Sequence, residues 1–304
     1  MQGFLFFILV RLLYFLSWLP FPVLYAVSDL MYVIVYRLIK YRKKVVIQNL
    51  ERSFPEKSSE EIQTIAKAYY HYLCDLILET FKTLTITKEE AIRRCRFHDL
   101  TLFRKLYAEN KNIILVMGHY GNWEWAGSTM SLETAYQLYV IYHPLSNKYF
   151  DQLIYDMRSR FGTKLIPMNN TFRDMVKNKS IVNATAFIAD QTPPAERAYW
   201  TTFLNQETPI FEGTAKIAKK LNYPIVFVNV KRTKRGYYEI FTEVLVEHPQ
   251  LLSEEEISEL HTRRLEQEII KQPEIWLWSH KRWKHKKPSQ LITVAKNSTA
   301  PVST

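Results

Sequence analysis

The residues best suited to do chemistry are His119 and Glu124, which lie five positions apart in the segment Gly118–Glu124. A neutral imidazole can remove a proton from an alcohol when a carboxylate accepts its other ring N–H and stabilises the imidazolium that forms. General-base action of this kind contributes roughly 10²–10⁴-fold to a rate. We therefore predict that His119 is a general base and that Glu124 orients it, as a His-x4-Glu (HX4E) motif.

The segment that precedes His119 supports this interpretation. The apolar run Ile113–Met117 is typical of a buried strand in a parallel sheet. Ligands of open α/β sheets bind just beyond the carboxyl ends of the strands, which is where His119 follows. Asn122 is a favoured N-cap and would start a helix there. Glu124 would then lie in the first turn, and free N–H groups at the helix start could hold an oxyanion. A purely structural histidine is the alternative.

Other catalytic machinery is missing from the sequence. It contains no G-x-S-x-G nucleophile elbow, no HExxH or Cys/His cluster for zinc, and no glycine-rich phosphate loop. A histidine base without a protein nucleophile favours direct transfer to an alcohol or amine that a substrate supplies. We accordingly expect no covalent enzyme intermediate, no metal and no cofactor.

The rest of the chain alternates strand-like and helix-like segments. Three further apolar runs resemble strands: Leu138–Tyr142, Ala184–Ala189 and Ile225–Val230. Helix-like segments lie at Glu124–Ser131, Tyr149–Arg160 and Thr214–Leu221. This alternation predicts an α/β fold with a mainly parallel central sheet flanked by helices. Polar residues follow the strands and should converge on one rim, namely His143, Asp190, Lys231 and Arg232.

The N-terminus predicts a hydrophobic, helical membrane anchor over residues 1–38. Arg11 is the only charge between residues 3 and 28, and a membrane span needs about 20 apolar residues. Pro20 and Pro22 interrupt the run. A kinked or tilted span, an interfacial hairpin and a buried core helix are all compatible with this pattern. We expect residues 39–288 to form the folded domain and residues 289–304 to be a disordered polar tail.

Charge and cysteine content indicate the compartment and the partners. The formal net charge of +11 implies an acidic partner, such as anionic lipid, an acidic protein or nucleic acid. Basic residues follow the apolar segment at once, and the positive-inside rule then places the domain in the cytoplasm. These residues are Arg37, Lys40, Arg42, Lys43 and Lys44. The two cysteines, Cys74 and Cys95, have no metal-like spacing and fit a reducing environment.

Several blocks together resemble the bacterial lipid A late (secondary) acyltransferase family, of the lauroyl/myristoyl type, within the glycerolipid acyltransferase-like superfamily. Gly118–Glu124 is similar to the signature of that superfamily. The further blocks, which agree in order and spacing, are Asn49–Glu56, Pro144 with Asn147, Asp151, Arg158 and Arg160, Ala189–Gln191, Phe203 with Gly213, and Glu274–Arg282. The resemblance covers about residues 40–288, so residues 39–288 would be the acyltransferase domain.

The resemblance implies transfer of a fatty acyl group from acyl carrier protein or acyl-CoA to a hydroxyl of a lipid A precursor. The enzyme would lie in the bacterial inner membrane, with its catalytic domain facing the cytoplasm. The partners would be the thioester donor, a glycolipid acceptor and membrane lipid, with no nucleic acid. His119 would deprotonate the hydroxyl and Glu124 would orient His119. The expected substrate-binding residues are Asn122, His143, Arg158, Arg160, Asp190, Gln191, Lys281 and Arg282.

Alternatives accompany several of these roles. Arg158 and Arg160 would contact phosphate or oxyanion, or else form a solvated helix face. Asp190 would shape the site or cap a turn. The basic segment Lys281–Lys287 suits phosphorylated lipid, an acidic carrier protein or nucleic acid, and is otherwise a solvated tail. His143 stands where many members of the family carry Arg. Another glycolipid or a glycerophospholipid is a second candidate acceptor, and a non-catalytic, membrane-tethered basic binding protein is a candidate of another class.

Overall fold

A seven-stranded sheet forms the centre of the molecule in a computed structural model, which describes residues 2–288. Its strands are β1 (Cys95–Phe97), β2 (Ile113–Met117), β3 (Gln137–Tyr142), β4 (Lys164–Pro167), β5 (Asn183–Ile188), β8 (Ile225–Lys234) and β9 (Tyr237–Val246). The strand order is β1-β9-β8-β2-β5-β3-β4, and within this sheet only the β8–β9 hairpin is antiparallel. The predicted α/β class with a mainly parallel sheet is confirmed.

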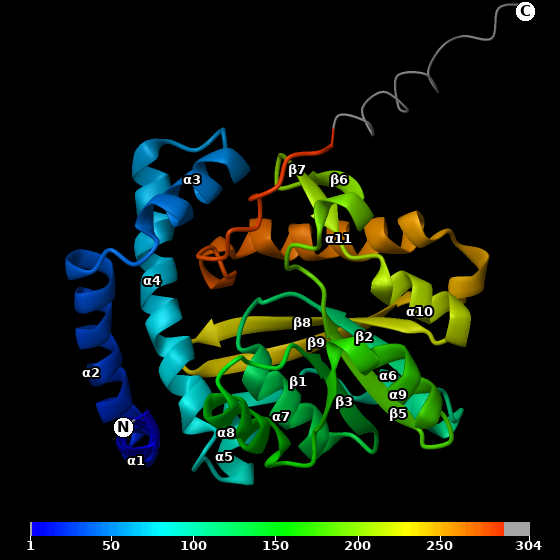
Figure 1. Cartoon of the computed structure of the whole chain (residues 1–304), viewed down its shortest axis with the longest axis horizontal. Helices are drawn as coiled ribbons and strands as arrows, with labels where there is room; N and C mark the ends of the chain where they lie inside the picture. The colour runs from blue at the N-terminus through cyan, green and yellow to red at the C-terminus, as the bar shows by residue number, and fades with distance from the viewer. Residues whose placement is uncertain (1, 289–304) are drawn as a thin grey trace, which may run out of the picture.

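Helices surround this sheet, and a small hairpin stands apart from it (Figure 1). The α-helices are α1 (Gln2–Trp18), α2 (Phe21–Tyr32), α3 (Lys43–Ser53), α4 (Ser59–Lys82), α5 (Lys88–Arg94), α6 (Thr101–Ala108), α7 (Trp123–Glu133), α8 (Lys148–Ser159), α9 (Thr171–Lys177), α10 (Gly213–Leu221) and α11 (Glu254–Lys271). A π-helix spans Val33–Leu38, and short 3-10 turns lie at Met168–Asn170, Ala195–Arg197, Pro249–Leu251 and Pro273–Ile275. The two-stranded hairpin pairs β6 (Tyr199–Phe203) with β7 (Gln206–Ile210).

The alternation of side chains along β2 divides the core into two layers. Ile113, Leu115 and Met117 pack into the cluster that α5, α6 and α7 share. Ile114 and Val116 face the opposite cluster, which α4, α10 and α11 cover. All five side chains of β2 are buried. A central strand covered on both sides explains why this run is continuously apolar.

Helix α4 supports the side of the molecule to which the N-terminus docks. Ser58 accepts from Glu61 N while the Glu61 carboxylate accepts from Ser58 N, which is a complete capping box. Along its 24 residues α4 buries both apolar and ionisable side chains, among them Asp75 and Glu79. This long helix therefore carries polar groups into the core, and each of them needs a partner there.

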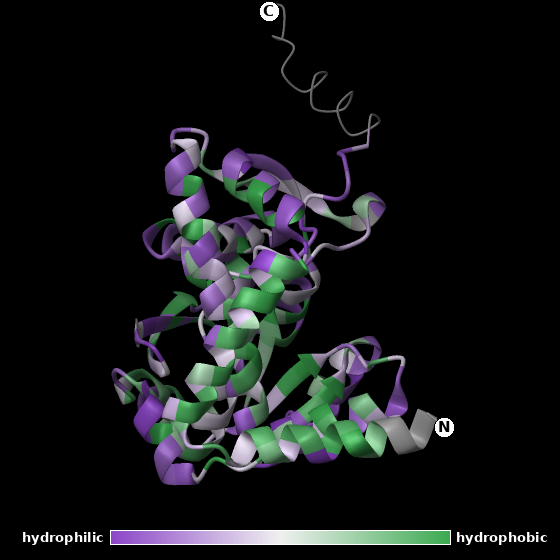
Figure 2. Ribbon diagram, turned by 90° about the vertical axis from the view of Figure 1, so that its left-hand side faces the viewer, coloured by the Kyte–Doolittle hydropathy of each residue, from purple (hydrophilic) through white to green (hydrophobic). Residues whose placement is uncertain are grey.

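The apolar N-terminus is two helices separated at Pro20 (Figure 2). Residues Phe21–Leu38 are long and apolar enough to be a candidate membrane anchor. One face of α2 is nevertheless tied to α4, since Tyr25 donates to Glu79 at 2.8 Å and Ser28 donates to Asp75 at 2.7 Å. The segment thus docks on the folded domain along a polar stripe.

The opposite faces of these helices remain apolar and exposed. The side chains concerned include Phe7, Leu12, Phe15 and Trp18 of α1 and Val23, Leu30, Ile34 and Leu38 of the second segment. Figure 2 shows α1 along the lower edge of the molecule with α2 rising from its end, both largely hydrophobic. Such a contiguous apolar surface on a folded domain is characteristic of an interaction with a membrane or a partner. The expected tail, residues 289–304, lies outside the described residues.

We expect Gly121→Ala to destabilise the fold strongly. Gly121 has a φ of +60°, and a Cβ there would lie 2.1 Å from the carbonyl oxygen of Val230. Backbone strain and overlap with a fixed carbonyl should lower the free energy of unfolding by about 2 kcal/mol or more. Thermal unfolding of the purified protein in detergent measures this.

Gly127→Ala is the matched control for that substitution. Gly127 lies inside α7, and a Cβ there meets no atom within 4 Å. Replacing a helical glycine by alanine should raise the free energy of unfolding by up to about 1 kcal/mol. Equal unfolding midpoints for the two variants would contradict the described turn.

Candidate active site

Two neighbouring parallel strands deliver the central residues of the site. His119 lies two residues beyond the end of β2, and Asp190 lies two residues beyond the end of β5. The two strands pair in parallel up to Met117 and Ile188, so both chains leave the sheet at the same rim. The rim of an open α/β sheet is the usual position for a ligand.

The His119 ring is held by Asp190. Nδ1 of His119 lies 2.5 Å from Oδ1 of Asp190, and the backbone N–H of His119 donates to Oδ2 at 2.7 Å. A carboxylate only accepts, so Nδ1 carries the ring proton and Nε2 is the basic atom. Nε2 lies 3.3 Å from the side-chain nitrogen of Gln191. The geometry is that of an imidazole base oriented by a carboxylate.

The environment of Asp190 keeps its carboxylate ionised. Its side chain is 4% exposed. Burial alone raises the pKa of Asp190, but the His119 ring and the hydrogen bonds from Trp276 and His119 N lower that pKa to about 2. A negative charge next to His119 is therefore present over the whole physiological pH range.

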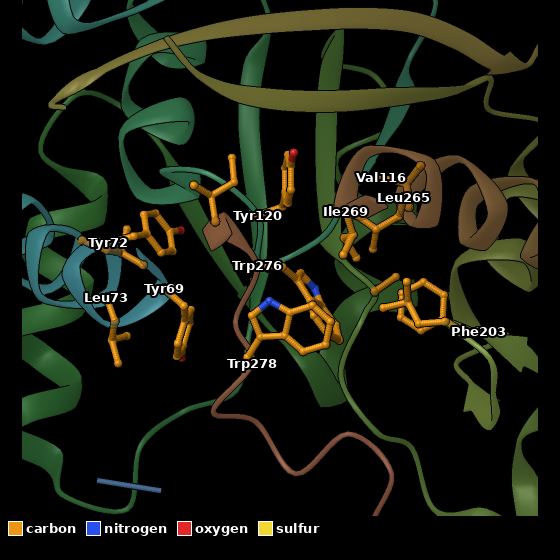
Figure 3. Packing of buried hydrophobic residues seen from close by; sticks show 14 of the residues in the cluster. Tyr69, Tyr72, Leu73, Val116, Tyr120, Phe203, Leu265, Ile269, Trp276 and Trp278 are labelled. Carbon is orange, nitrogen blue, oxygen red and sulfur yellow. The ribbon is translucent and has the colours of Figure 1, made fainter. Parts of the chain in front are cut away.

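Trp276 supplies the third donor to Asp190. Its Nε1 donates to Oδ2 at 2.8 Å, and its ring is 2% exposed. Figure 3 shows Trp276 and Trp278 within the buried cluster, together with Phe203 and residues of α11. The indole packs edge-to-face on Trp278 at 4.6 Å between ring centroids. Packing of the C-terminal segment thus fixes the Asp190 carboxylate.

Glu124 has a different partner from the one expected. Its carboxylate forms a two-pronged ion pair with Arg158, with distances of 2.9 Å to Nε and 2.5 Å to Nη2. Burial lowers the pKa of Arg158, but the Glu124 carboxylate raises it above its ordinary value. The prediction that Glu124 orients His119 is therefore wrong, because Asp190 occupies that position.

His119, Glu124, Arg158, Gln191 and His143 nevertheless line one cavity of about 380 Å³. Its remaining wall is largely apolar and comes from β3, α8, β5, the loop between β3 and α8, and the turn after β4. The apolar side chains are Val140, Ile141, Leu145, Ile154, Met157, Met168 and Ile188. The cavity can therefore hold an apolar chain beside a base and a paired cation.

The turn between His119 and α7 is fixed by hydrogen bonds. Gly121 N donates to the Ile275 carbonyl, and the Gly121 carbonyl accepts from Tyr72. Asn122 caps α7 by accepting from Trp125 N, which confirms its predicted N-cap role. Asn122 is 0% exposed, so its predicted contact with substrate is wrong.

The turn presents other groups to the site. The first N–H groups of a helix have no partner within the helix. In α7 these belong to Trp123 and Glu124, both of which line the cavity. The Trp123 ring packs edge-to-face on His119 at 5.0 Å between centroids. The start of α7, whose first N–H groups have no partner within the helix, thus lies next to the base.

Three of the predicted substrate-binding residues, Arg160, Lys281 and Arg282, do not line the cavity. Arg160 donates to the carbonyls of Thr83 and Ile86, where it ties α8 to the end of α4. Arg282 is 1% exposed and donates to the Pro209 carbonyl. The predicted contact of Arg282 with substrate is wrong because its side chain is buried, whereas that of the exposed Arg160 stays a prediction. Lys281 is exposed on the surface and does not line the cavity.

Only some of the polar residues that were predicted to converge on the rim of the sheet lie together there. The strand ends bring His119, His143 and Asp190 together, with the first two lining the cavity. Lys231 and Arg232 belong instead to the continuing strand β8, and Arg232 bonds Asp75 of α4 at 2.7 Å. The chain runs past the rim there because β8 continues into an antiparallel hairpin.

Trp276 is the functional residue that motif reasoning missed. The available signal was its place within Glu274–Arg282, a segment rich in tryptophan and cations. His280 is a second such residue, since its Nε2 lies 3.3 Å from Thr192 Oγ1 beside the Asp190 turn. Burial lowers the pKa of His280 to about 4. Among the described residues no group of His, Cys, Asp and Glu could hold a metal ion.

Comparison with known proteins agrees with this geometry. A family model described as "Bacterial lipid A biosynthesis acyltransferase" matches residues 1–285. The chain belongs to this family. It is an acyltransferase, and its family acts in the biosynthesis of lipid A. The resemblance noted in the sequence is confirmed.

Several lipid A acyltransferases are similar to this chain over most of its length. A lipid A biosynthesis palmitoleoyltransferase of Escherichia coli strain K12 is 23% identical over 269 residues, which are 88% of this chain and 86% of that protein. A lipid A biosynthesis lauroyltransferase of the same strain is 22% identical over 284 residues, covering 89% and 92%. A lipid A biosynthesis acyltransferase of Haemophilus influenzae is 23% identical over 236 residues, covering 76% and 72%.

Acid should expose the electrostatic role of Asp190 in this acyltransferase. Because the pKa of Asp190 is lowered from 3.8 to about 2, its ionised form stabilises the fold above pH 4. That contribution, roughly 2 kcal/mol, is lost as the pH falls through 4 towards 2. Urea unfolding at several pH values should therefore show a gap between wild type and Asp190→Asn that narrows below pH 4. A gap that is independent of pH would contradict the lowered pKa of Asp190.

Proposed function

We propose that this family member transfers a fatty acyl group from an acyl thioester to a hydroxyl of a lipid A precursor, with His119 as general base. The observation that carries the proposal is the His119–Asp190 pair, which leaves Nε2 as the basic atom of a ring that lines an apolar-walled cavity. A base oriented in this way needs no protein nucleophile, because the acceptor hydroxyl attacks the thioester directly.

The proposed reaction has two steps. The acceptor oxygen bonds to the thioester carbon while its proton passes to Nε2 of His119, and the carbonyl oxygen becomes an oxyanion. The tetrahedral intermediate then collapses, the C–S bond breaks, and the leaving thiolate takes the proton from the imidazolium. Asp190 stabilises that imidazolium, while the first N–H groups of α7 and Arg158 are donors for the oxyanion.

An acidic carrier protein is the donor that best fits the charge of the chain. The net charge of +11 favours association with an acidic carrier through long-range attraction. The exposed Lys281 lies close in sequence to His280, which reaches the Asp190–Thr192 turn. The apolar wall of the cavity suits the acyl chain. Acyl-CoA is the other possible thioester.

The proposed location is the cytoplasmic face of the inner membrane. The apolar faces of α1 and α2 would contact acyl chains, since side chains such as Phe15 and Trp18 are 63% and 73% exposed. The basic residues Lys40, Arg42, Lys43 and Lys44 follow directly and border an open groove. Each basic residue near an anionic surface contributes about 1 kcal/mol to binding.

Substitution of the two carboxylates distinguishes their roles. In assays with acyl carrier protein thioesters, Asp190→Asn should lower kcat by about 10³–10⁴-fold, because it disturbs the tautomer and charge of His119. Glu124→Gln should lower kcat less, by about ten- to hundredfold, because it releases Arg158 but leaves the base oriented. His119→Ala should lose turnover in a protein that still folds, with a lowered thermal unfolding midpoint because the buried Asp190 carboxylate loses one of its donors. The opposite order of the two carboxylate variants would contradict the assignment.

The lipid A of a strain that lacks this protein identifies the acceptor. Mass spectrometry should show lipid A that has lost one acyl group, whose mass gives the length of the transferred chain. Wild-type protein should restore the group, and His119→Ala should not. Unchanged lipid A accompanied by loss of an acyl group from another glycolipid or a glycerophospholipid would contradict the proposed acceptor.

A further inference from the structure

Glu79 is a buried carboxylate to which the proposed reaction gives no role. It lies in α4, is 0% exposed and does not line the cavity. Burial of an ionisable group is costly unless hydrogen bonds satisfy it. Its neighbours should therefore explain why a carboxylate stands at this position.

Three elements donate to Glu79. Tyr25 of α2 donates to Oε1 at 2.8 Å. Asn122, the cap of α7, donates to Oε2 at 2.8 Å, and Tyr238 of β9 donates to the same oxygen at 2.7 Å. The backbone carbonyl of Glu79 also accepts from the indole of Trp125 at 2.8 Å. One residue of α4 thus connects helix α2, strand β9 of the central sheet and the start of α7 beside the active site.

Asn122 depends on this carboxylate. Its Oδ1 already accepts from Trp125 N, so its NH₂ group faces the other way and must donate. Asn122 is fully buried, and the described acceptor of that donor is Glu79. Without Glu79 the amide either stays unpaired or turns, and turning gives up the cap. Glu79 therefore selects the amide orientation that starts α7 at Trp123.

The start of α7 determines the geometry of the reacting groups. Trp123 packs on the His119 ring, and Glu124 in the first turn holds Arg158. The first N–H groups of α7, which we propose as oxyanion donors, belong to the same turn. A displacement of this turn by about 1 Å can cost about 10²-fold in rate. A residue that holds Asn122 would therefore affect catalysis by fixing the position of the reacting groups, without touching the substrate.

We propose that Glu79 is a positioning residue for acyl transfer, and that α2 shares this role because Tyr25 holds Glu79 from the N-terminal side. Phe21 of α2 adds an edge-to-face contact with Trp125, the residue whose N–H Asn122 caps. Helix α2 is then part of the support of the active site in addition to its apolar outer face. The inference rests on the proposed acyl transfer at His119.

Matched substitutions in α2 test the proposal in the full-length protein in detergent. Tyr25→Phe and Ser28→Ala each remove one hydroxyl that bonds a buried carboxylate of α4, but only Tyr25 bonds Glu79. Both should lower the thermal unfolding midpoint. With an acyl carrier protein thioester and a lipid A precursor, Tyr25→Phe should lower kcat about three- to tenfold with KM for the thioester little changed, whereas Ser28→Ala should keep kcat.

A double-mutant cycle tests the link to Asn122. Asn122→Ser retains a capping oxygen but removes the amide donor to Glu79, and Glu79→Leu removes the acceptor of that donor. Each should lower kcat about tenfold or more, and the double variant should lose little beyond either single variant. Additive losses, or equal kcat for Tyr25→Phe and Ser28→Ala, would overturn the positioning role. Wild-type protein with no more transfer than His119→Ala would instead refute the proposed function itself.

Discussion

The Asp190 carboxylate is the interaction on which the arrangement of the site depends. A charge that is almost fully buried is tolerated only when its lone pairs are satisfied. Here the donors are the His119 ring, the His119 backbone and the Trp276 indole. Two of them come from the end of β2, and the third comes from a segment about 150 residues later in the chain. The fold must therefore bring three distant segments to one point before the histidine has an orienting partner.

The C-terminal segment completes this arrangement by backbone contacts. Leu277 N donates to the His119 carbonyl, and Gly121 N donates to the Ile275 carbonyl, so the segment lies against the turn that carries the base. Asn49 of α3 binds the carbonyls of Trp278 and His280 from the other side. The blocks that resemble the acyltransferase family are far apart in sequence, yet these contacts join them around one turn. These blocks are therefore parts of one structural unit around the His119 turn.

Much of the fold could be predicted because the signals are local. The continuous apolar run Ile113–Met117 indicates a strand buried on both faces, and Asn122 indicates a helix start. Strands β4 and β9 lacked such a signal, since β4 has only four residues and β9 carries charges along its exposed face. The position of His119 at the sheet rim followed from the strand that precedes it. Local pattern was sufficient wherever one element alone decided the outcome.

The partner of His119 could not be derived in this way. Glu124 is near in sequence, whereas Asp190 is near only because β5 pairs with β2, and strand order is a property of the whole sheet. The same limit applies to Arg160 and Arg282, whose residue type suggested phosphate but whose guanidinium groups bind backbone carbonyls. Contacts between residues far apart in the sequence determine that Arg158, and neither Arg160 nor Arg282, lines the cavity.

The Glu124–Arg158 pair acquires a different meaning once Asp190 orients the base. Their side chains are 11% and 27% exposed, and both line a largely apolar cavity. An unpaired guanidinium there would be costly and would attract any anion, whereas a paired one is neutralised in the ground state. When the hydroxyl adds to the thioester carbon, negative charge develops on the former carbonyl oxygen and the same cation can interact with it. The neutral carbonyl of the bound substrate attracts that cation only weakly. A contact that strengthens as charge develops lowers the barrier without tightening substrate binding, which is the condition for a gain in kcat. Glu124 would then serve the reaction by keeping Arg158 in place and moderating its charge until the transition state.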